Sequence, residues 1–428
     1  MHPPAPSAAS ASAQSAVGAT ESDRPSCYSW VVFAISFALM MSDYMSRQVL
    51  LAVFPFIKAE WALSDTQLGL LVSVVALTVG VMIIPISLIA DRVGRVRSIT
   101  AMALIWGMAT IACGLADNFF ALFIARAVLG LGEAGYGSAG GAIVLQRFPL
   151  RMRSTVAGSY LSASIFGSVL GIALGGILAQ QLGWRLAFIL VGAGGLVLAL
   201  AFPLIVREQP ADGGKIAARL PLKEVARTLL TARTTVWLYL GLAATMFVQS
   251  GLIAWASTYL NRYHAMDPAN AAKHAAVLAL CTGVGMAGGG YVVDRLSRQD
   301  GRRRLRIPAL FAFCSGLILL TAFQCSPGVL QFALMGAGLT VGACVIGSGM
   351  AVVTELAPAT LHATALATMA LAMNVLGSAP GPTVIGWIAD RSGLHAALQL
   401  LPLPCLVSAI AFAIAANYYE ADKRRLHG

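Results

Sequence analysis

Long runs of apolar residues, separated by short polar stretches, dominate the pattern of this chain. Runs such as 70–88 and 187–206 have about the 20 residues that a helix needs to cross a bilayer. Twelve segments are predicted to be membrane-spanning helices: 30–56, 66–89, 97–116, 119–145, 154–180, 185–206, 234–260, 272–293, 306–325, 329–355, 361–388 and 396–418. Only 11% of the 428 residues are charged, against about 25% in soluble domains. The pattern therefore predicts an all-α membrane protein with twelve transmembrane helices.

Positive charge is concentrated in alternate connections between these segments. With the N-terminus placed inside, 22 of the 29 Lys and Arg residues fall on the cytoplasmic side. The positive-inside rule therefore predicts a multi-pass protein of the inner (plasma) membrane with both termini in the cytoplasm. This topology accounts for the net charge of +11, so the charge indicates the lipid bilayer as partner and not a nucleic acid.

The polar stretches divide the chain into two halves of six segments each. The stretch 207–233 is the longest of them, and within it 220–230 has the spacing of an amphipathic helix with a basic face, which suits the membrane surface. The predicted domains are a disordered cytoplasmic tail 1–27, a six-helix bundle 28–206, a cytoplasmic linker 207–233, a second six-helix bundle 234–420 and a cytoplasmic tail 421–428.

Two short motifs recur at almost the same interval. The run Asp91-Arg92-Val93-Gly94-Arg95 returns 203 residues later as Asp294-Arg295-Leu296-Ser297-Arg298. Arg147-Phe148-Pro149 is matched 209 residues later by Leu356-Ala357-Pro358. Two matches at nearly one offset indicate an internal duplication, which in a membrane protein is typical of a transporter built from two bundles.

Over residues 28–420 the chain resembles the major facilitator superfamily. The Asp91 loop, its copy at Asp294 and the long central linker carry that resemblance. The runs Leu63–Gly69 and Gly130–Tyr136 resemble the bacterial Spinster-like branch, and the anion:cation symporter branch is similarly close. The resemblance implies alternating access between two bundles. It also implies a gate formed by the two charged loops, with the following residues: Asp91, Arg92, Arg95, Asp294, Arg295 and Arg298.

Four charged residues fall in the interior of the predicted spans of the first half, away from their ends. They are Asp43 and Arg47 in the first span and Arg126 and Glu133 in the fourth. An unpaired charge at this depth is costly, so such residues face a cavity or one another. A buried carboxyl can load and release a proton, and an arginine freed from it can bind an anion. We therefore expect Asp43 and Glu133 to couple protons and Arg47 and Arg126 to bind an anion; the alternative is a static ion-pair cluster.

The first span departs from the pattern of Spinster-like relatives, which have Asn-Tyr-x-Asp-Arg. Here the run is Asp43-Tyr44-Met45-Ser46-Arg47. Arg47 and Tyr44 match the family, Ser46 replaces its acid, and Asp43 stands one turn away in place of its Asn. Tyr44 is a candidate substrate contact, and the pattern leaves open whether Asp43 or Glu133 carries the proton.

Other features of the spans refine the prediction. Gly167, Gly171 and Gly175 in the fifth span predict close helix packing, and Ile172, where the superfamily's antiporter motif has a proline, disfavours antiport. The second half has no acid at the centre of a span. Its candidate substrate contacts are uncharged and partly aromatic: Gln249, Trp255, Tyr259 and Asn374.

The favoured function is proton-coupled transport of an organic anion by a protein that is not an enzyme. The alternatives are a lysophospholipid or other amphiphile transporter, a drug or metabolite:proton antiporter and, from another class, a non-transporting membrane sensor. The seven cysteines form no close pair and the six histidines avoid segment centres, so no metal site is predicted. We expect no cofactor and a monomer whose partners are protons and a small organic anion or amphiphile.

Overall fold

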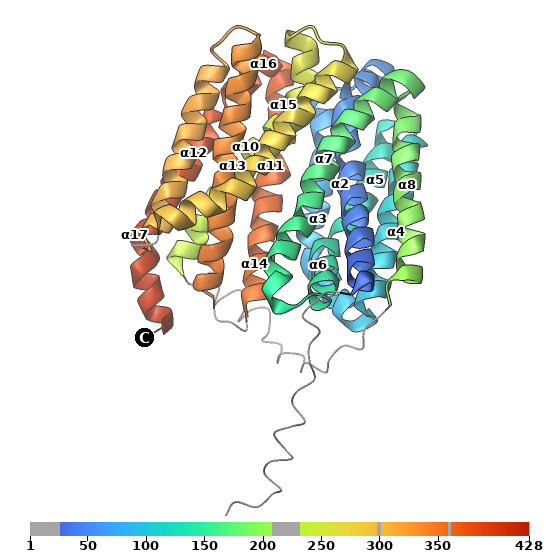
Figure 1. Cartoon of the computed structure of the whole chain (residues 1–428). Coiled ribbons are helices and arrows are strands. Elements are labelled where there is room, and N and C mark those ends of the chain that lie inside the picture. Colours follow the sequence, from blue (N-terminus) through green and yellow to red (C-terminus); the bar gives the residue numbers. More distant parts are fainter. Residues whose placement is uncertain (1–25, 208–231, 298–300, 358–360, 428) are drawn as a thin grey trace, which may run out of the picture.

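The computed structural model describes residues 26–207, 232–297, 301–357 and 361–427. Residues 1–25 of the predicted N-terminal tail and the predicted amphipathic helix of the linker lie outside these ranges; Ser26 and Cys27 of that tail instead cap and begin the first helix. The described chain is helical almost throughout, and its first and second halves form two bundles that lie side by side (Figure 1). The end of the molecule at which the C-terminus lies is called the tail end below, and the opposite end the far end.

The N-terminal bundle contains six membrane-crossing segments. Its helices are α2 (Cys27–Trp61), α3 (Asp65–Val93), α4 (Arg95–Gly114), α5 (Phe119–Glu133), α6 (Tyr136–Gln146), α7 (Arg153–Leu182) and α8 (Trp184–Ile205), with a 3-10 turn at Leu150–Met152. Local sequence explains several boundaries. Ser64 and Gln67 form a capping box at the start of α3, and the Asn118 side chain caps α5, so free backbone N–H groups at these ends are satisfied.

The C-terminal bundle repeats this plan. Its helices are α10 (Arg233–Tyr263), α11 (Pro268–Leu296), α12 (Arg303–Ala322), α13 (Val329–Glu355), α14 (His362–Ala372), α15 (Pro380–Ser392), α16 (Leu394–Gln399) and α17 (Pro402–His427). A π-helical stretch, η3 (Met373–Ser378), joins α14 to α15. The two bundles together give the predicted fold of twelve transmembrane helices.

Two of the twelve segments are interrupted near the middle of their length. Ten stretches of the described chain are long and apolar enough to cross a membrane as one helix. The fourth segment is divided between α5 and α6 at Ala134 and Gly135. The eleventh is divided by the π-helical stretch before Pro380. Such breaks are tolerated in a membrane where protein or a cavity surrounds them, so both positions are candidates for functional sites.

Glycines on α7 set the position of α2. A Cβ atom at Gly167, Gly171 or Gly175 would lie within 2.9 Å of α2. The α2 atoms met there are the carbonyl oxygens of Met41 and Met45 and a side-chain methyl of Val49. The three glycines are four residues apart and so lie on one face of α7. This close approach, which the sequence predicts, fixes the helix that carries Asp43 and Arg47.

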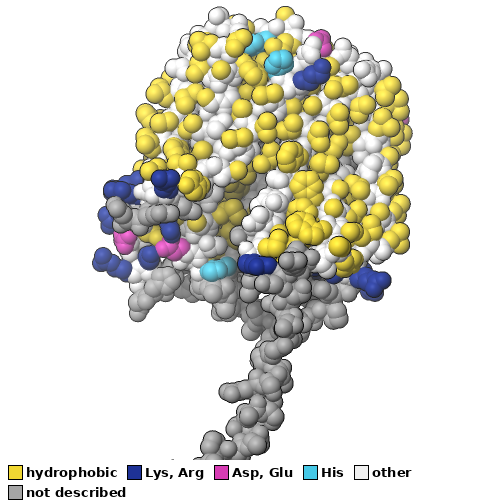
Figure 2. All heavy atoms as spheres, viewed as in Figure 1, with side chains coloured by type: hydrophobic (Ala, Val, Ile, Leu, Met, Phe, Trp, Pro, Cys, Tyr) yellow, Lys and Arg dark blue, Asp and Glu magenta, His cyan; other side chains and the backbone are white. Residues whose placement is uncertain are grey.

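The bundles meet most closely toward the far end. A Cβ at Gly69 of α3 would lie 2.5 Å from the Pro382 carbonyl oxygen of α15. Toward the tail end, a Cβ at Gly158 of α7 or Gly288 of α11 would meet nothing within 4 Å. Figure 2 shows the surface hollowed between the bundles in its lower half, with hydrophobic side chains over the flanks and Lys and Arg gathered near the tail end. The bundles are therefore joined at the far end and parted at the tail end.

Two glycines of α11 provide a matched test of packing. A Cβ at Gly285 would lie 2.1 Å from the Thr340 carbonyl oxygen, whereas one at Gly288 would meet nothing. We expect Gly285→Ala to destabilise the protein by about 1–3 kcal/mol, because α11 and α13 would have to separate. Gly288→Ala should leave stability unchanged or raise it by up to about 1 kcal/mol, because alanine favours the helix more than glycine does. Thermal unfolding of the detergent-solubilised protein measures both, and equal losses would contradict this account.

Candidate functional site

A cavity of about 180 Å³ lies within the N-terminal bundle at the break between α5 and α6. Residues of α2, α3 and this break line it: Met40, Asp43, Tyr44, Arg47, Val79, Ile83, Glu133, Ala134 and Tyr136. Four of the residues predicted for proton coupling or substrate binding are therefore brought together, namely Asp43, Tyr44, Arg47 and Glu133. Glu133 is the last residue of α5, so the interruption of the fourth segment places its carboxyl at the cavity wall.

The charged groups of the cavity are only loosely paired. An Arg47 nitrogen lies 3.7 Å from Glu133 Oε2, with 24% of the Arg47 side chain and 5% of the Glu133 side chain exposed. Asp43 is 6% exposed, and its Oδ1, like Glu133 Oε1, is buried without a hydrogen-bond partner. Asp43 and Arg47 lie one turn apart on α2 and so share its cavity face. Within the described chain, the Arg47 guanidinium therefore pairs with Glu133 alone, and each of the two carboxyls keeps an oxygen that can take up a proton or accept a hydrogen bond from a ligand.

The hydroxyl groups at the cavity differ in availability. The Tyr136 hydroxyl donates to the Ser36 carbonyl oxygen at 2.8 Å, which ties the start of α6 to α2. Tyr44 lines the cavity from α2, and its Cβ lies against the position of Gly167 on α7. Tyr136 therefore holds the wall together, whereas Tyr44 is placed to contact a ligand.

The structure places the predicted anion contact Arg126 away from the cavity. Arg126 is fully buried and donates to the Leu71 carbonyl oxygen of α3 at 3.2 Å. It also donates to the carbonyl oxygens of Ser46 and Arg47 on α2, at 3.4 and 3.2 Å. Its guanidinium thus joins α5 to two neighbouring helices, because carbonyl oxygens at this depth can partner a buried cation where water is absent.

The uncharged residues predicted in the second half are engaged in packing. Trp255 donates to the Pro382 carbonyl oxygen at 3.0 Å, and the Tyr259 hydroxyl lies 3.0 Å from His395 Nδ1. Asn374 lies in the π-helical stretch and donates to the Ala370 carbonyl oxygen; its Cβ faces the position of Gly80 on α3. These three side chains are not among those that line the cavity.

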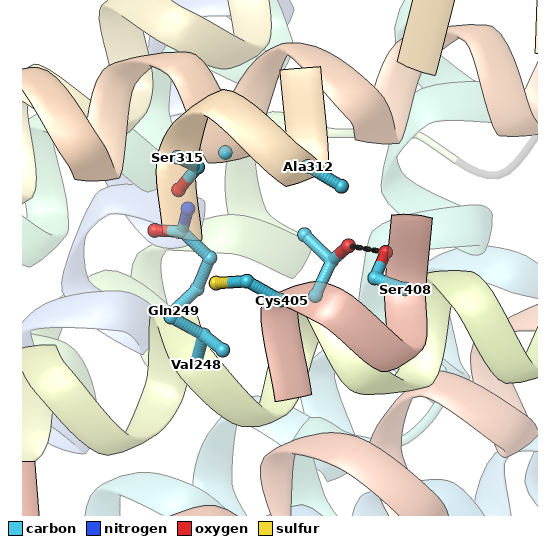
Figure 3. Close-up of a pocket in the computed structure, with 8 residues that line it drawn as sticks. Val248, Gln249, Ala312, Ser315, Cys405 and Ser408 are labelled. Atoms are coloured by element: carbon cyan, nitrogen blue, oxygen red, sulfur yellow. Dashed lines mark hydrogen bonds between the residues drawn. The ribbon is translucent and has the colours of Figure 1, made fainter. Parts of the chain in front are cut away.

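Gln249 belongs to a second, much smaller void inside the C-terminal bundle. This void has about 10 Å³, close to the space of one water. Gln249, Ser315 and Cys405 point toward one another around it (Figure 3). The Gln249 amide donates to the Leu339 carbonyl oxygen at 3.0 Å, so its polar end is already partnered and serves helix packing.

The predicted gate at the tail end falls largely outside the description. Arg298 and the side chains of Asp91, Arg92 and Asp294 are not described. Arg95 begins α4, and Arg295 is exposed and donates to the Tyr291 hydroxyl one turn earlier at 3.3 Å. The gate at these loops remains a prediction.

Sequence reasoning missed a polar contact that joins the two bundles at the far end. The Asp65 carboxylate accepts two hydrogen bonds of 2.8 Å from the Arg262 guanidinium at the end of α10, and it also pairs with Lys58. The Asp390 carboxylate of α15 accepts from the backbone N–H groups of Asp65 and Thr66 at 2.7 and 2.9 Å. Asp390 thus caps the N-terminus of α3 from the opposite bundle. We call Asp65, Arg262 and Asp390 the far-end clasp.

A sequence signal for this clasp was available. Asp65 follows the cap residue Ser64 within the run Leu63–Gly69, which carries the family resemblance. An acid at the first position of a helix is explained by the helix dipole alone. Asp65 therefore gave no reason to expect a further partner such as Arg262. Arg262 and Asp390 are 197 and 325 residues away, and only the fold brings them to Asp65.

Comparison with known proteins agrees with this architecture. Residues 33–382 match the family model described as Major Facilitator Superfamily. A "MFS-type efflux pump" of Mycolicibacterium smegmatis is 27% identical over 92% of this chain and 94% of its own length. A "Probable L-galactonate transporter" of Escherichia coli is 26% identical over 69% of each chain. The crystal structure of a bacterial homologue of the human lysosomal transporter Spinster, inward-facing and unoccupied, has a TM-score of 0.79 and 24% identity, covering 94% of this chain and 98% of that one.

The far-end clasp should hold the bundles together. In a background without the seven native cysteines, Ser73→Cys places a thiol on α3 beside Thr383 of α15, at a position now 7% exposed. We expect Asp65→Asn to raise its labelling by a water-soluble maleimide about tenfold or more, because hydrogen bonds to charged groups contribute about 1.5–3 kcal/mol each.

Glu60→Gln is the matched control for this test. Glu60 pairs with Arg185 at 2.7 Å, near the same end of the molecule but within one bundle. Loss of the Glu60 carboxylate should leave maleimide labelling at position 73 unchanged. Equal labelling in the Asp65→Asn and Glu60→Gln variants would contradict a role for the clasp in joining the bundles.

Proposed function

Because this chain belongs to the major facilitator superfamily, we propose that it is a transporter that moves a small organic anion together with protons by alternating access. The observation that carries the proposal is the cavity in which Asp43, Glu133 and Arg47 meet. Its lining residues lie near the middle of α2 and α3, a depth that suits a site reached from one side of the membrane at a time.

The charges of the cavity give a reason for coupling. With both carboxyls ionised, Asp43, Glu133 and Arg47 sum to one negative charge, which repels an anion. One proton makes the cavity neutral and a second makes it positive. Burial disfavours the two carboxylates together, so protonation precedes anion binding and frees the Arg47 guanidinium to receive the anion. Protons and anion then travel in the same direction.

Alternating access requires that the bundles separate at the far end and close at the tail end. The far-end clasp and the contact of Gly69 with α15 would have to open in that step. If the loop charges orient the protein as predicted, the tail end faces the cytoplasm of a cell bounded by this inner membrane. The described conformation would then face inward.

The printed names of relatives support an anionic cargo without defining it. The relative from Escherichia coli is named for L-galactonate, a sugar acid, and the one from Mycolicibacterium smegmatis is named an efflux pump. The geometry at Arg47 favours an anion, and two carboxyls beside it favour symport with protons over exchange against them. We therefore propose uptake coupled to protons.

Glu133→Gln separates coupling from binding. The amide resembles the protonated carboxyl, so the variant should still exchange anion across liposome membranes but lose the uptake driven by an inward proton gradient. The measurements are counterflow and pH-driven uptake of a panel of organic anions in liposomes that contain the full chain. Asp117→Asn, at an exposed loop carboxyl, is the control and should preserve both activities. Gradient-driven uptake that survives Glu133→Gln at the wild-type rate would overturn the proposed role of Glu133.

Arg47→Lys tests the anion contact. A lysine keeps the positive charge but cannot form the paired hydrogen bonds of a guanidinium with a carboxylate. We expect the KM for the transported anion to rise about tenfold or more, since charge-assisted hydrogen bonds are worth about 1.5–3 kcal/mol, with a smaller change in maximal rate. An unchanged KM would place the anion elsewhere.

A further inference from the structure

We propose that the anion is a small monoanion with an aromatic or branched apolar body, close in size to a benzene ring that bears one acidic group. This inference rests on the proposed function and names the substrate class of the same cavity. It is carried by three properties of the cavity, namely the chemistry of its wall, its volume and its single cation.

The wall of the cavity is mostly apolar. Met40 of α2, Val79 and Ile83 of α3 and Ala134 after α5 offer only hydrocarbon or thioether surface. Tyr44 adds an aromatic ring. An apolar ligand body gains from leaving water against such a surface, and the flexible Met40 side chain can adapt to its shape and contact a ring.

The same wall disfavours polyhydroxylated acids. The neutral polar groups that line the cavity are the hydroxyls of Tyr44 and Tyr136, and the Tyr136 hydroxyl already donates to the Ser36 carbonyl oxygen. A sugar acid would bury several hydroxyls. Those beside Asp43 or Glu133 could donate to a carboxyl oxygen, but those facing Met40, Val79 and Ile83 would lose water without gaining a partner. The site should therefore reject a sugar acid more strongly than an apolar anion of equal size.

The volume fits one ring. An apolar protein cavity of about 150 Å³ accommodates benzene, and this cavity has about 180 Å³. The difference leaves room for one acidic group beside the ring. The cavity is open on one side, so a long acyl chain would have to extend out of it and only the headgroup of a lysolipid would be enclosed.

The charges restrict the ligand to one acidic group. Arg47 is the single cation among the lining residues, and Asp43 and Glu133 flank it. One acidic group can pair with the guanidinium, but a second on the same ring would approach one of the two carboxyls. A dianion should therefore bind more weakly than a monoanion of the same shape.

Benzenesulfonate is a suitable probe because it stays ionised and does not cross the bilayer unaided. Liposomes containing the full chain should take it up in a saturable manner, faster under an inward proton gradient. A tenfold excess of L-galactonate or benzene-1,3-disulfonate should reduce uptake by less than half. Competition by either of them equal to that of unlabelled benzenesulfonate would overturn the inference, as would transport of a lysophospholipid in place of benzenesulfonate.

These outcomes separate the inference from the proposed function. Proton-driven uptake of L-galactonate without uptake of benzenesulfonate would leave the proposed function standing and overturn the substrate class. Failure of every organic anion in the panel to move with protons would overturn both.

Val79→Thr tests the wall itself, because threonine keeps the shape of valine and adds a hydroxyl. We expect the KM for benzenesulfonate to rise roughly three- to tenfold as the apolar contact is lost, with the maximal rate nearly unchanged. Val81→Thr on the same helix is the control, since Val81 is 48% exposed and does not line the cavity. Equal KM values for the two variants would show that Val79 does not contact the ligand body.

Discussion

The high cost of a charge without water is the constraint on which this structure depends. For Arg126 this cost is offset by hydrogen bonds, because its guanidinium donates to backbone carbonyl oxygens of two other helices. For Asp43 and Glu133 the cost is offset only in part, since each carboxyl retains a buried oxygen without a hydrogen-bond partner. A charge that is fully partnered is part of the scaffold, whereas carboxyls that are partly partnered can exchange protons at little structural cost. Within one bundle, Arg126 therefore stabilises the packing of the helices, whereas Asp43 and Glu133 are the groups available for proposed proton exchange.

Small residues make this arrangement geometrically possible. Gly167, Gly171 and Gly175 bring α7 against the backbone of α2, and α2 carries both Asp43 and Arg47. On the other side of α2, the break after α5 brings Glu133 to the same cavity. The distance between Arg47 and Glu133 therefore depends on how three helices pack, and a small movement of any of them changes the pairing of the charges.

The sequence predicted much of the fold and part of the site. Apolar length predicted the twelve segments, and the four-residue spacing of the α7 glycines predicted their packing. Asp43 and Arg47 could be placed on one face because one turn of one helix joins them. Arg126 could not be placed, because its partners are backbone atoms that leave no pattern in the sequence. Trp255 and Tyr259 were predicted to contact substrate but lie in packed regions. The sequence could not separate the two cases, since aromatic residues suit a cavity wall and a packed interface equally well. Asp65 was missed because Arg262 and Asp390 reach it only through the fold.

The nine residues that line the cavity all belong to one half of the duplicated chain. The other half supplies Arg262 and Asp390 to the contact that joins the bundles, and its own small void is nearly filled. On the proposed function, the residues that contact cargo all lie in the first half, whereas the contact that joins the bundles uses Asp65 of the first half and Arg262 and Asp390 of the second. Val79 lines the cavity, and its neighbour Gly80 packs against Asn374 of the other bundle, so α3 takes part in both the cavity and the interface. The first half of the gene therefore encodes the cavity together with Asp65 and Gly69, which the second half contacts, so on the proposed function a change of cargo in that half has to preserve the residues that join the bundles.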